Sequence, residues 1–197
     1  FKGGGIMKTL EEKIIKEGKV LPGHILKVGS FLNQQLDVGF LSEIGEEIKN
    51  IYKDCNVTKI LTIEASGIAL AVAAGMTMHI PALFAKKGKS ANVSGDVYKT
   101  IVHSYTHNND YNIIVPKEYL SRDDCIVIVD DFLANGKALE GLIDIVNQSG
   151  AKLAGCTCAI EKGFQGGGDA LRKKGIRIES LAVVEEMSES GIRFRDI

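Results

Sequence analysis

Hydrophobic residues follow two patterns along this chain. Apolar positions three or four apart predict helices over 7–18 and from Leu41 to Ile51. From residue 59 onward, short continuous apolar runs alternate with further helical segments. The runs predict strands at 59–63, 81–85, 126–131, 153–161 and 177–184, and the segments between them predict helices at 68–78, 136–150 and 169–175. A shorter strand is predicted at 24–28.

Continuous apolar strands separated by helices are typical of a parallel sheet that is covered on both faces. We therefore predict an α/β fold with an open, mainly parallel sheet and a small hood formed by the N- and C-terminal segments. Residues 86–117 interrupt the alternation. Apolar and polar residues alternate over 97–105 and 111–115, on either side of a polar turn, which predicts an inserted β-hairpin flap. Such hairpins often close over a substrate.

Composition narrows the choice of partners. The 197 residues suit one domain, over 7–197, and residues 1–6 (FKGGGI) resemble a tag remnant. With 24 basic and 25 acidic residues the net charge is −1, so no basic field favours nucleic acid or a membrane surface. We find no apolar stretch of membrane-spanning length and no secretion signal, and expect a cytoplasmic protein that binds small molecules.

Cysteines and histidines do not predict a metal centre. The four cysteines, at 55, 125, 156 and 158, lack C-x-x-C spacing, and the histidines at 24, 79, 103 and 107 fit no ligand pattern. We expect reduced thiols, and structural or exposed roles for the histidines. No residue is therefore predicted to bind a metal directly.

An acidic pair closes the predicted strand 126–131. Asp130 and Asp131 precede a short turn, and the next helix would present unpaired backbone N–H groups to an anion. Gly136 would allow a phosphate close to the main chain, and Asn135 tolerates an unusual backbone angle. Two carboxylates beside a phosphate loop suit the vicinal hydroxyls of a pentose phosphate. A strand-end turn followed by a capped helix is the alternative interpretation.

A second turn occupies the equivalent position after the strand 59–63. Glu64, Ala65, Ser66 and Gly67 would offer another set of free N–H groups and a hydroxyl, although many such turns only cap helices. The pair Lys86–Lys87, at the end of a third strand, could neutralise a second anion, and a solvated lysine run is the alternative. Two anion sites on one sheet edge suggest a sugar with phosphates at both ends.

The segment IVIVDDFLANGKA resembles the signature of the type I phosphoribosyltransferases, which consists of an apolar strand, two acidic residues and a phosphate loop. Asn-Gly-Lys-Ala stands where many members have Thr-Gly-Gly-Thr. Within the family, the segments LKVGSFLNQQLD, TIEASGIA, DDFLANGKAL, IEKGFQ and IESLA resemble the bacterial members that act on xanthine. The resemblance covers nearly the whole chain.

This resemblance implies roles for individual residues. The 5-phosphate of phosphoribosyl diphosphate (PRPP) would bind the loop formed by Ala134, Asn135, Gly136, Lys137 and Ala138, with Asp130 and Asp131 on the ribose hydroxyls as the catalytic pair. Its diphosphate would lie among Glu64, Ala65, Ser66, Gly67, Lys86 and Lys87, with Mg²⁺ held through PRPP. Leu26, Asn33 and Lys162 would line the base pocket. Phe132 or Phe164 is a candidate for stacking on the purine, although we favour a core position for both.

The implied reaction is purine salvage: displacement of diphosphate from PRPP by a purine, through an oxocarbenium-like transition state, in a homodimer. Asn33 and Lys162 favour oxopurines over adenine, and the residues alone do not rank xanthine above guanine or hypoxanthine. Asp130 or Asp131 is a possible proton acceptor, and none is needed if the purine binds as an anion. The alternative is a regulator that binds PRPP and a purine without turnover. It would need a basic DNA-binding face, whereas the N-terminal helices are acidic.

Overall fold

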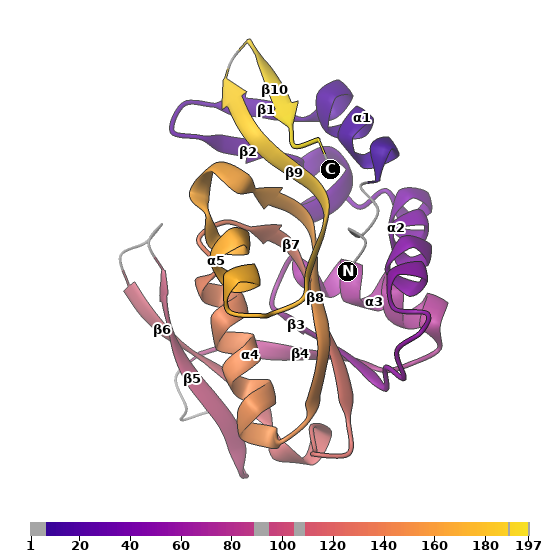
Figure 1. The fold of residues 1–197 in the computed structure, drawn as a ribbon, viewed down its shortest axis with the longest axis vertical. Helices are drawn as coiled ribbons and strands as arrows, with labels where there is room; N and C mark the ends of the chain where they lie inside the picture. Colours follow the sequence, from indigo (N-terminus) through magenta and orange to yellow (C-terminus); the bar gives the residue numbers. More distant parts are fainter. Residues whose placement is uncertain (1–6, 89–94, 105–108, 189, 197) are drawn as a thin grey trace.

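The computed structural model describes residues 7–88, 95–104, 109–188 and 190–196. Within these residues one sheet has the strand order β10-β9-β8-β7-β3-β4-β6-β5 (Figure 1). Its members are β3 (Lys59–Ile63), β4 (Ala82–Lys87), β5 (Val97–Ser104), β6 (Asn109–Pro116), β7 (Cys125–Leu133), β8 (Lys152–Lys162), β9 (Ile178–Ser188) and β10 (Gly191–Phe194). Strands β9, β8, β7, β3 and β4 run parallel, and antiparallel strands close both edges. The predicted α/β fold is confirmed.

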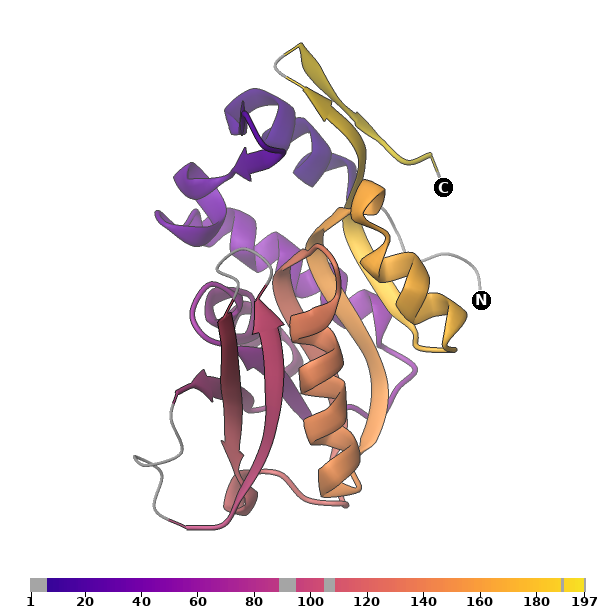
Figure 2. The same ribbon diagram turned by 90° about the vertical axis from the view of Figure 1, so that its left-hand side faces the viewer.

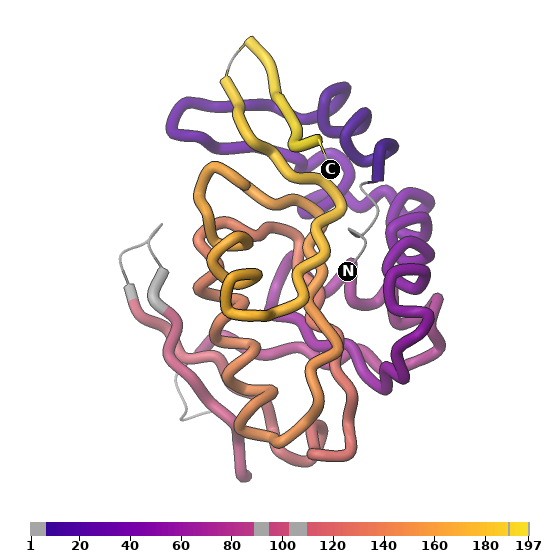
Figure 3. Tube along the Cα trace, in the orientation of Figure 1, coloured from indigo at the N-terminus to yellow at the C-terminus, as the bar shows by residue number. Residues whose placement is uncertain are grey.

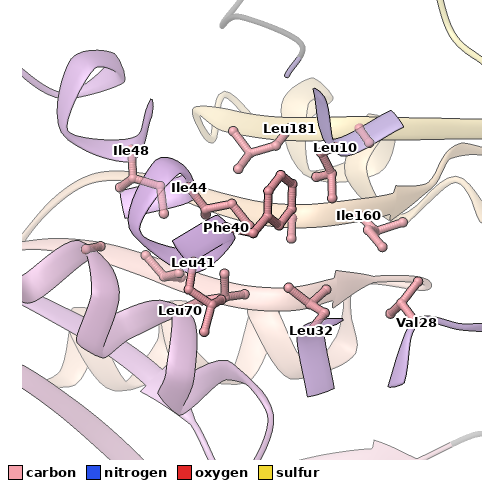
Figure 4. Packing of buried hydrophobic residues seen from close by; sticks show 14 of the residues in the cluster. Leu10, Val28, Leu32, Phe40, Leu41, Ile44, Ile48, Leu70, Ile160 and Leu181 are labelled. Atoms are coloured by element: carbon pink, nitrogen blue, oxygen red, sulfur yellow. The ribbon is translucent and has the colours of Figure 1, made fainter. Parts of the chain in front are cut away.

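Two buried clusters lie on opposite faces of this sheet because neighbouring residues of a strand point to opposite sides. In β7, Val127 belongs to one cluster and Ile126 to the other. The first cluster includes residues of α1 (Lys8–Glu17), α2 (Val38–Ile51) and α3 (Gly67–Met78), and Figure 4 shows part of this packing. The second lies beneath α4 (Lys137–Ser149) and α5 (Gly167–Lys173). Each helix and strand predicted from residue 59 onward is present, with ends shifted by a few residues.

The predicted hairpin is formed by β5 and β6, and residues 105–108 of its turn lie outside the described part of the chain. The structure differs from the prediction in how this hairpin is attached. Lys86 of β4 pairs with Ile114 of β6, so the two strands extend the sheet. The hairpin lies beside α4 (Figure 2). There the side chains of Val102 and Ile113 approach Gly141. Burial of these side chains explains why the base of the hairpin is part of the fold.

The predicted hood lies above the carboxyl ends of the central strands. It contains the antiparallel strands β1 (Lys19–Leu21) and β2 (Ile25–Lys27) and the π-helical turn η1 (Gly29–Asn33). Strand β2 corresponds to the predicted strand at 24–28, whereas β1 was not predicted. Two short helical turns, η3 (Lys117–Tyr119) and η4 (Gly163–Gln165), follow β6 and β8 respectively. Figure 3 shows the N-terminal segment and the C-terminal strands at the same end of the molecule, where β1 contacts β9. N- and C-terminal segments thus form the hood together, while the proposed tag remnant at 1–6 lies outside the described residues.

None of the helices in the described ranges is both long and apolar enough to cross a membrane.

Candidate active site

Strand β7 continues through the acidic pair and ends at Leu133, two residues later than the sequence predicted. Phe132 and Leu133 extend the strand because they pair with Ile160 and Glu161 of β8. Asp130 and Asp131 are therefore held by the sheet, with exposed fractions of 9% and 7%. The Asp131 N–H donates to Asp130 Oδ1 over 3.0 Å. The carboxylate pair therefore belongs to the sheet, near the carboxyl end of the central strand β7.

The two carboxyl groups have different surroundings. Asp130 lines a pocket with the loop that follows β7, whereas Asp131 Oδ2 accepts a hydrogen bond of 3.1 Å from Asn33 Nδ2 in the hood. Burial raises the pKa of the Asp130 carboxyl well above its ordinary value, and the charge of Asp131 raises it further. Lys87 opposes this rise. Asp130 thus holds a proton more readily than an ordinary aspartate does.

The predicted phosphate loop, residues 134–138, leads from β7 into α4. Gly136 has a φ of +84°, a left-handed conformation that favours glycine, and it occupies the N-cap of α4. The Asn135 Oδ1 atom accepts from the Lys137 N–H over 3.1 Å and so stabilises the turn. A pocket of about 90 Å³ lies here. Its lining includes Asp130, Phe132 and all five loop residues Ala134, Asn135, Gly136, Lys137 and Ala138.

Lys137 contributes to this loop in a way that the sequence did not reveal. Its ammonium group donates to Glu140 Oε2 over 2.8 Å, and Glu140 also accepts from Lys174. These two lysines lower the pKa of the Glu140 carboxyl. The charge of the Lys137 side chain is thus shared with the first turn of α4. What the loop offers an anion is mainly its backbone at a helix N-terminus.

The second predicted anion loop, Glu64 to Gly67, joins β3 to α3. Its Glu64–Ala65 peptide bond is cis, and Glu64 Oε1 accepts from the Lys87 N–H over 2.5 Å. A Cβ atom on Gly67 would overlap Thr62 Oγ1 and lie 2.9 Å from Asp130 Oδ1. Only glycine therefore lets the start of α3 approach the acidic pair so closely. The structure brings this loop, the end of β4 and Asp130 together, as the sequence predicted.

Lysine charge on this side of the site comes from the end of β4. Lys86 and Lys87 are both exposed, and the Lys87 ammonium lies 5.4 Å from the ring centroid of Tyr111 in β6. Burial raises the pKa of Tyr111, and the nearby Asp130 charge adds to the effect. Lys87, Tyr111 and Asp130 thus influence one another electrostatically. Tyr111 was not identified from the sequence, because its place beside Lys87 depends on pairing between β4 and β6.

The four predicted base-binding residues fall into two groups. Lys162, at the end of β8, donates to the His24 carbonyl over 3.0 Å, and its ammonium lies 5.6 Å from the Phe132 ring centroid. Burial lowers the pKa of Lys162. Leu26 and Asn33 instead line a hood pocket of about 500 Å³. The Asn33–Asp131 hydrogen bond connects this hood pocket to the acidic pair.

Sequence reasoning missed Thr62. Its side chain is buried beside Gly67, and in the described part of the chain its Oγ1 atom has no hydrogen-bond partner. A threonine within the apolar run of β3 was the only signal for it. His24 also takes part, since its carbonyl binds Lys162 and its ring lies 5.4 Å from that of Phe164. Phe164 is exposed, in contrast to the core position that the sequence favoured.

Thiols and metal ligands do not cluster at this site. All four cysteines are free, and burial raises the pKa of the Cys156 thiol to about 12 and that of Cys158 higher still. Among the residues that the structure describes, no group of three or more His, Cys, Asp or Glu side chains could hold a metal ion.

Comparison with known proteins gives a consistent result. The family model of the phosphoribosyl transferase domain matches residues 34–187. "Xanthine phosphoribosyltransferase 2" of Clostridium botulinum (strain Langeland) is 50% identical over 190 residues, which cover 96% of this chain and all of that protein. "Xanthine phosphoribosyltransferase" of Ruminiclostridium cellulolyticum is 48% identical over the same span.

Solved structures support the fold independently. An adenine phosphoribosyltransferase from Giardia lamblia, complexed with 9-deazaadenine, superimposes with a TM-score of 0.75 at 21% identity, covering 90% of this chain and 98% of that one. The Trypanosoma brucei adenine phosphoribosyl transferase, in complex with AMP, pyrophosphate and ribose-5-phosphate, has the same TM-score at 18% identity. At these identities the likeness establishes the shared fold.

Proposed function

Because this chain belongs to the phosphoribosyl transferase domain family, we propose that it transfers the 5-phosphoribosyl group of PRPP to xanthine, giving xanthosine 5′-monophosphate and diphosphate. The structural observation that carries the proposal is the position of Asp130. Its carboxyl group lines the pocket of the phosphate loop and also lies beside Gly67 of the second anion loop. A ribose whose hydroxyls meet this carboxyl pair would direct its two phosphate groups toward the two loops. We propose xanthine as the acceptor base because the two relatives that are 50% and 48% identical to this chain are xanthine phosphoribosyltransferases.

The proposed chemistry is substitution at the anomeric carbon of ribose. The bond from this carbon to the diphosphate oxygen breaks as a purine nitrogen forms a new bond from the opposite face. The proton of that nitrogen passes to Asp130 or Asp131, or has already left to solvent when the purine binds as an anion. Positive charge develops on the sugar, next to the acidic pair, while negative charge moves onto the diphosphate. Backbone dipoles at Glu64–Gly67 and the ammonium groups of Lys86 and Lys87 would stabilise that leaving group. Residues 134–138 would hold the 5-phosphate and fix the sugar.

Magnesium is the cofactor we propose, carried by PRPP. Mg²⁺ is commonly bound by one or two carboxylates together with substrate phosphates, and keeps several waters. We propose that the ion is held through PRPP, because the described residues contain no group of three or more side chains that could hold it. When bound, the ion would neutralise charge on the departing diphosphate.

Recognition of the base would depend on the ammonium group of Lys162. This group is held by the His24 carbonyl near Phe132, and it can donate to an oxo oxygen of a purine. Partial burial lowers its pKa but does not change its role as a donor. Guanine and hypoxanthine share an oxo group, so the same transfer to these purines is the alternative substrate choice.

We also propose that the protein is a homodimer. Helices α2 and α3, with the residues before α2, expose a cluster of large apolar side chains: Leu36, Val38, Val72 and Met76. Val38 is 75% exposed and Met76 is 72% exposed. They line an apolar groove of about 450 Å³, and contiguous apolar surface of this kind is typical of protein interfaces. Sedimentation should give the mass of two chains, and Met76→Lys should shift it toward one.

A cytoplasmic location is proposed as well, since all four cysteines are free and structural disulfides belong to oxidising compartments.

The decisive experiment compares initial rates with xanthine, guanine, hypoxanthine and adenine, each with PRPP and Mg²⁺. We expect the highest kcat/KM with xanthine and diphosphate as the co-product. Faster transfer to another purine would overturn the base assignment alone. A protein that binds PRPP without releasing diphosphate, and binds DNA in a salt-dependent manner, would instead be the regulator.

Lys162→Ala tests the base site separately. We expect the KM for xanthine to rise by about tenfold, the cost of losing one hydrogen bond from a charged donor, with a smaller change in the KM for PRPP. An equal loss for both substrates would mean that Lys162 acts only through the structure of the β8 end.

A further inference from the structure

The N-terminus of α5 lies directly against the backbone of the phosphate loop. A Cβ atom on Gly167 would overlap the Ala134 carbonyl oxygen and come within 2.6 Å of the Gly136 nitrogen. These are main-chain atoms, which cannot rotate away as a side chain can. The contact is reciprocal, because a Cβ on Gly136 would lie 3.5 Å from the Gly167 Cα atom and 3.3 Å from Leu171 Cδ1. Helix α5 therefore packs directly against the backbone of the phosphate loop.

A buried ion pair fixes α5 in this position. Glu161 of β8 has no exposed surface, and Arg172 of α5 donates to both of its carboxylate oxygens, over 2.9 and 2.7 Å. Ser180 of β9 donates to the same carboxylate. A Cβ on Gly168 would overlap this carboxylate, so the helix packs directly onto it. Bidentate pairs of this kind fix orientation as well as position.

Arg195 joins the hood to the same helix. Arg195 directly follows β10. Its Nη1 and Nη2 atoms donate to the two carboxylate oxygens of Asp169 over 3.0 and 3.1 Å, and its Nε donates to Glu185 of β9. Asp169 stands in the first turn of α5, two residues after Gly167. Arg195 lowers the pKa of the Asp169 carboxyl more than any other group does. The C-terminal segment is thus tied to the part of α5 that touches the loop.

We propose that α5 sets the position of the phosphate loop, and that Gly167 and Arg195 are positioning residues for PRPP binding. The inference rests on the proposed binding of the 5-phosphate by residues 134–138. Gly167 acts by close approach, since a larger residue would displace backbone groups that the phosphate requires. Arg195 acts through Asp169, holding the first turn of α5 against the loop. Neither residue would contact the substrate.

The first experiment substitutes Gly167→Ala and compares it with Gly39→Ala. Gly39 also stands in the first turn of a helix, but a Cβ there would meet only Asp37 Oδ1, at an ordinary 3.6 Å. For Gly167→Ala we expect the KM for PRPP, and the inhibition constant of ribose 5-phosphate, to rise by about tenfold or more, equivalent to roughly 1.4 kcal/mol. The KM for xanthine should change less than twofold by the same scale (~0.4 kcal/mol). Gly39→Ala should change neither constant.

The second experiment compares Arg195→Ala with Arg193→Ala. Arg193 lies two residues earlier, in β10, and its guanidinium group forms an ion pair with exposed Glu186. Arg195→Ala should raise the KM for PRPP by about threefold, or ~0.7 kcal/mol, with kcat nearly unchanged, and Arg193→Ala should leave both at wild-type values. This pair decides the matter if Gly167→Ala fails to fold.

The outcomes separate this inference from the proposed function. A folded Gly167→Ala protein with wild-type KM for PRPP overturns the role of α5, as does an Arg195→Ala protein that loses thermal stability alone. If ribose 5-phosphate does not inhibit the wild-type enzyme competitively with PRPP, the assignment of the loop itself fails, and the inference fails with it.

Discussion

The loops that follow β7 and β3 occupy equivalent positions in a parallel sheet, yet they offer an anion different things. Residues 134–138 pack against α5 and line a small pocket at the N-terminus of α4. Residues Glu64–Gly67 lie next to exposed lysines at the end of β4. One end of the site is thus built around a loop that is packed against a helix, and the other has exposed side-chain charge. Substitutions should act through geometry at the first loop and through electrostatics at the second.

The largest effect is expected at the acidic pair between the two loops. Asp130→Asn and Asp131→Asn keep the size of each side chain but remove the charge that faces the developing cation. We expect kcat to fall by about 10²- to 10³-fold in each variant, as when other preorganised groups are removed from active sites. Thermal unfolding should remain cooperative. Near-normal rates in both variants would show that the loops do not share one substrate.

Gly136→Ala tests the backbone-built end. A φ of +84° is unfavourable for alanine, and such strain is of order 1–3 kcal/mol. We expect the KM for PRPP to rise by about 5- to 100-fold, with little change for xanthine. The increase should persist at high salt, because its cause is loop geometry. An increase that disappears at high salt would contradict the distinction between the two loops.

Lys87→Ala tests the charged end. The ammonium group lies near Tyr111 and influences Asp130, so its removal weakens the field on the diphosphate side. We expect kcat/KM for PRPP to fall by about tenfold at low ionic strength, and by less at high salt, where exposed charges are screened. The exposed Lys99 of β5 is the control, and Lys99→Ala should show no loss. A salt-independent loss at Lys87 would place its role in backbone geometry, with the Glu64 contact.

The smallest effect concerns stability. Since burial raises the pKa of Asp130, the folded protein binds this proton more tightly than the unfolded chain does. Below the ordinary aspartate pKa of 3.8, the protonated carboxyl contributes its full share to the free energy of unfolding. This contribution is lost as pH rises toward the pKa in the folded protein. Asp130→Asn removes this dependence. The variant should therefore gain stability over wild type as pH rises above 3.8, measured by unfolding midpoints in denaturant. A constant difference as pH rises would contradict the raised pKa.

Local sequence patterns predicted most of the sheet and the turns that follow β3 and β7. Continuous apolar runs separated by helical segments predicted β3, β4, β7, β8 and β9, and alternating apolar and polar residues predicted the β5–β6 hairpin. The ends of elements were less well predicted. Strand β7 continues to Leu133 because β8 is there to pair with it, and no feature of residues 130–133 alone reveals that partner.

Contacts between distant segments were decided by the tertiary structure alone. The Asn33–Asp131 hydrogen bond joins residues 98 positions apart, and the approach of Gly67 to Thr62 and Asp130 unites β3, α3 and β7. Gly167 is one of three consecutive glycines, and only the folded chain shows that it lies against the backbone of residues 134–136. Periodicity and turn chemistry depend on residues that are close together in the sequence, so they can be recognised from the sequence alone. Register and close approach depend on how whole elements pack, and they exist only in the folded chain.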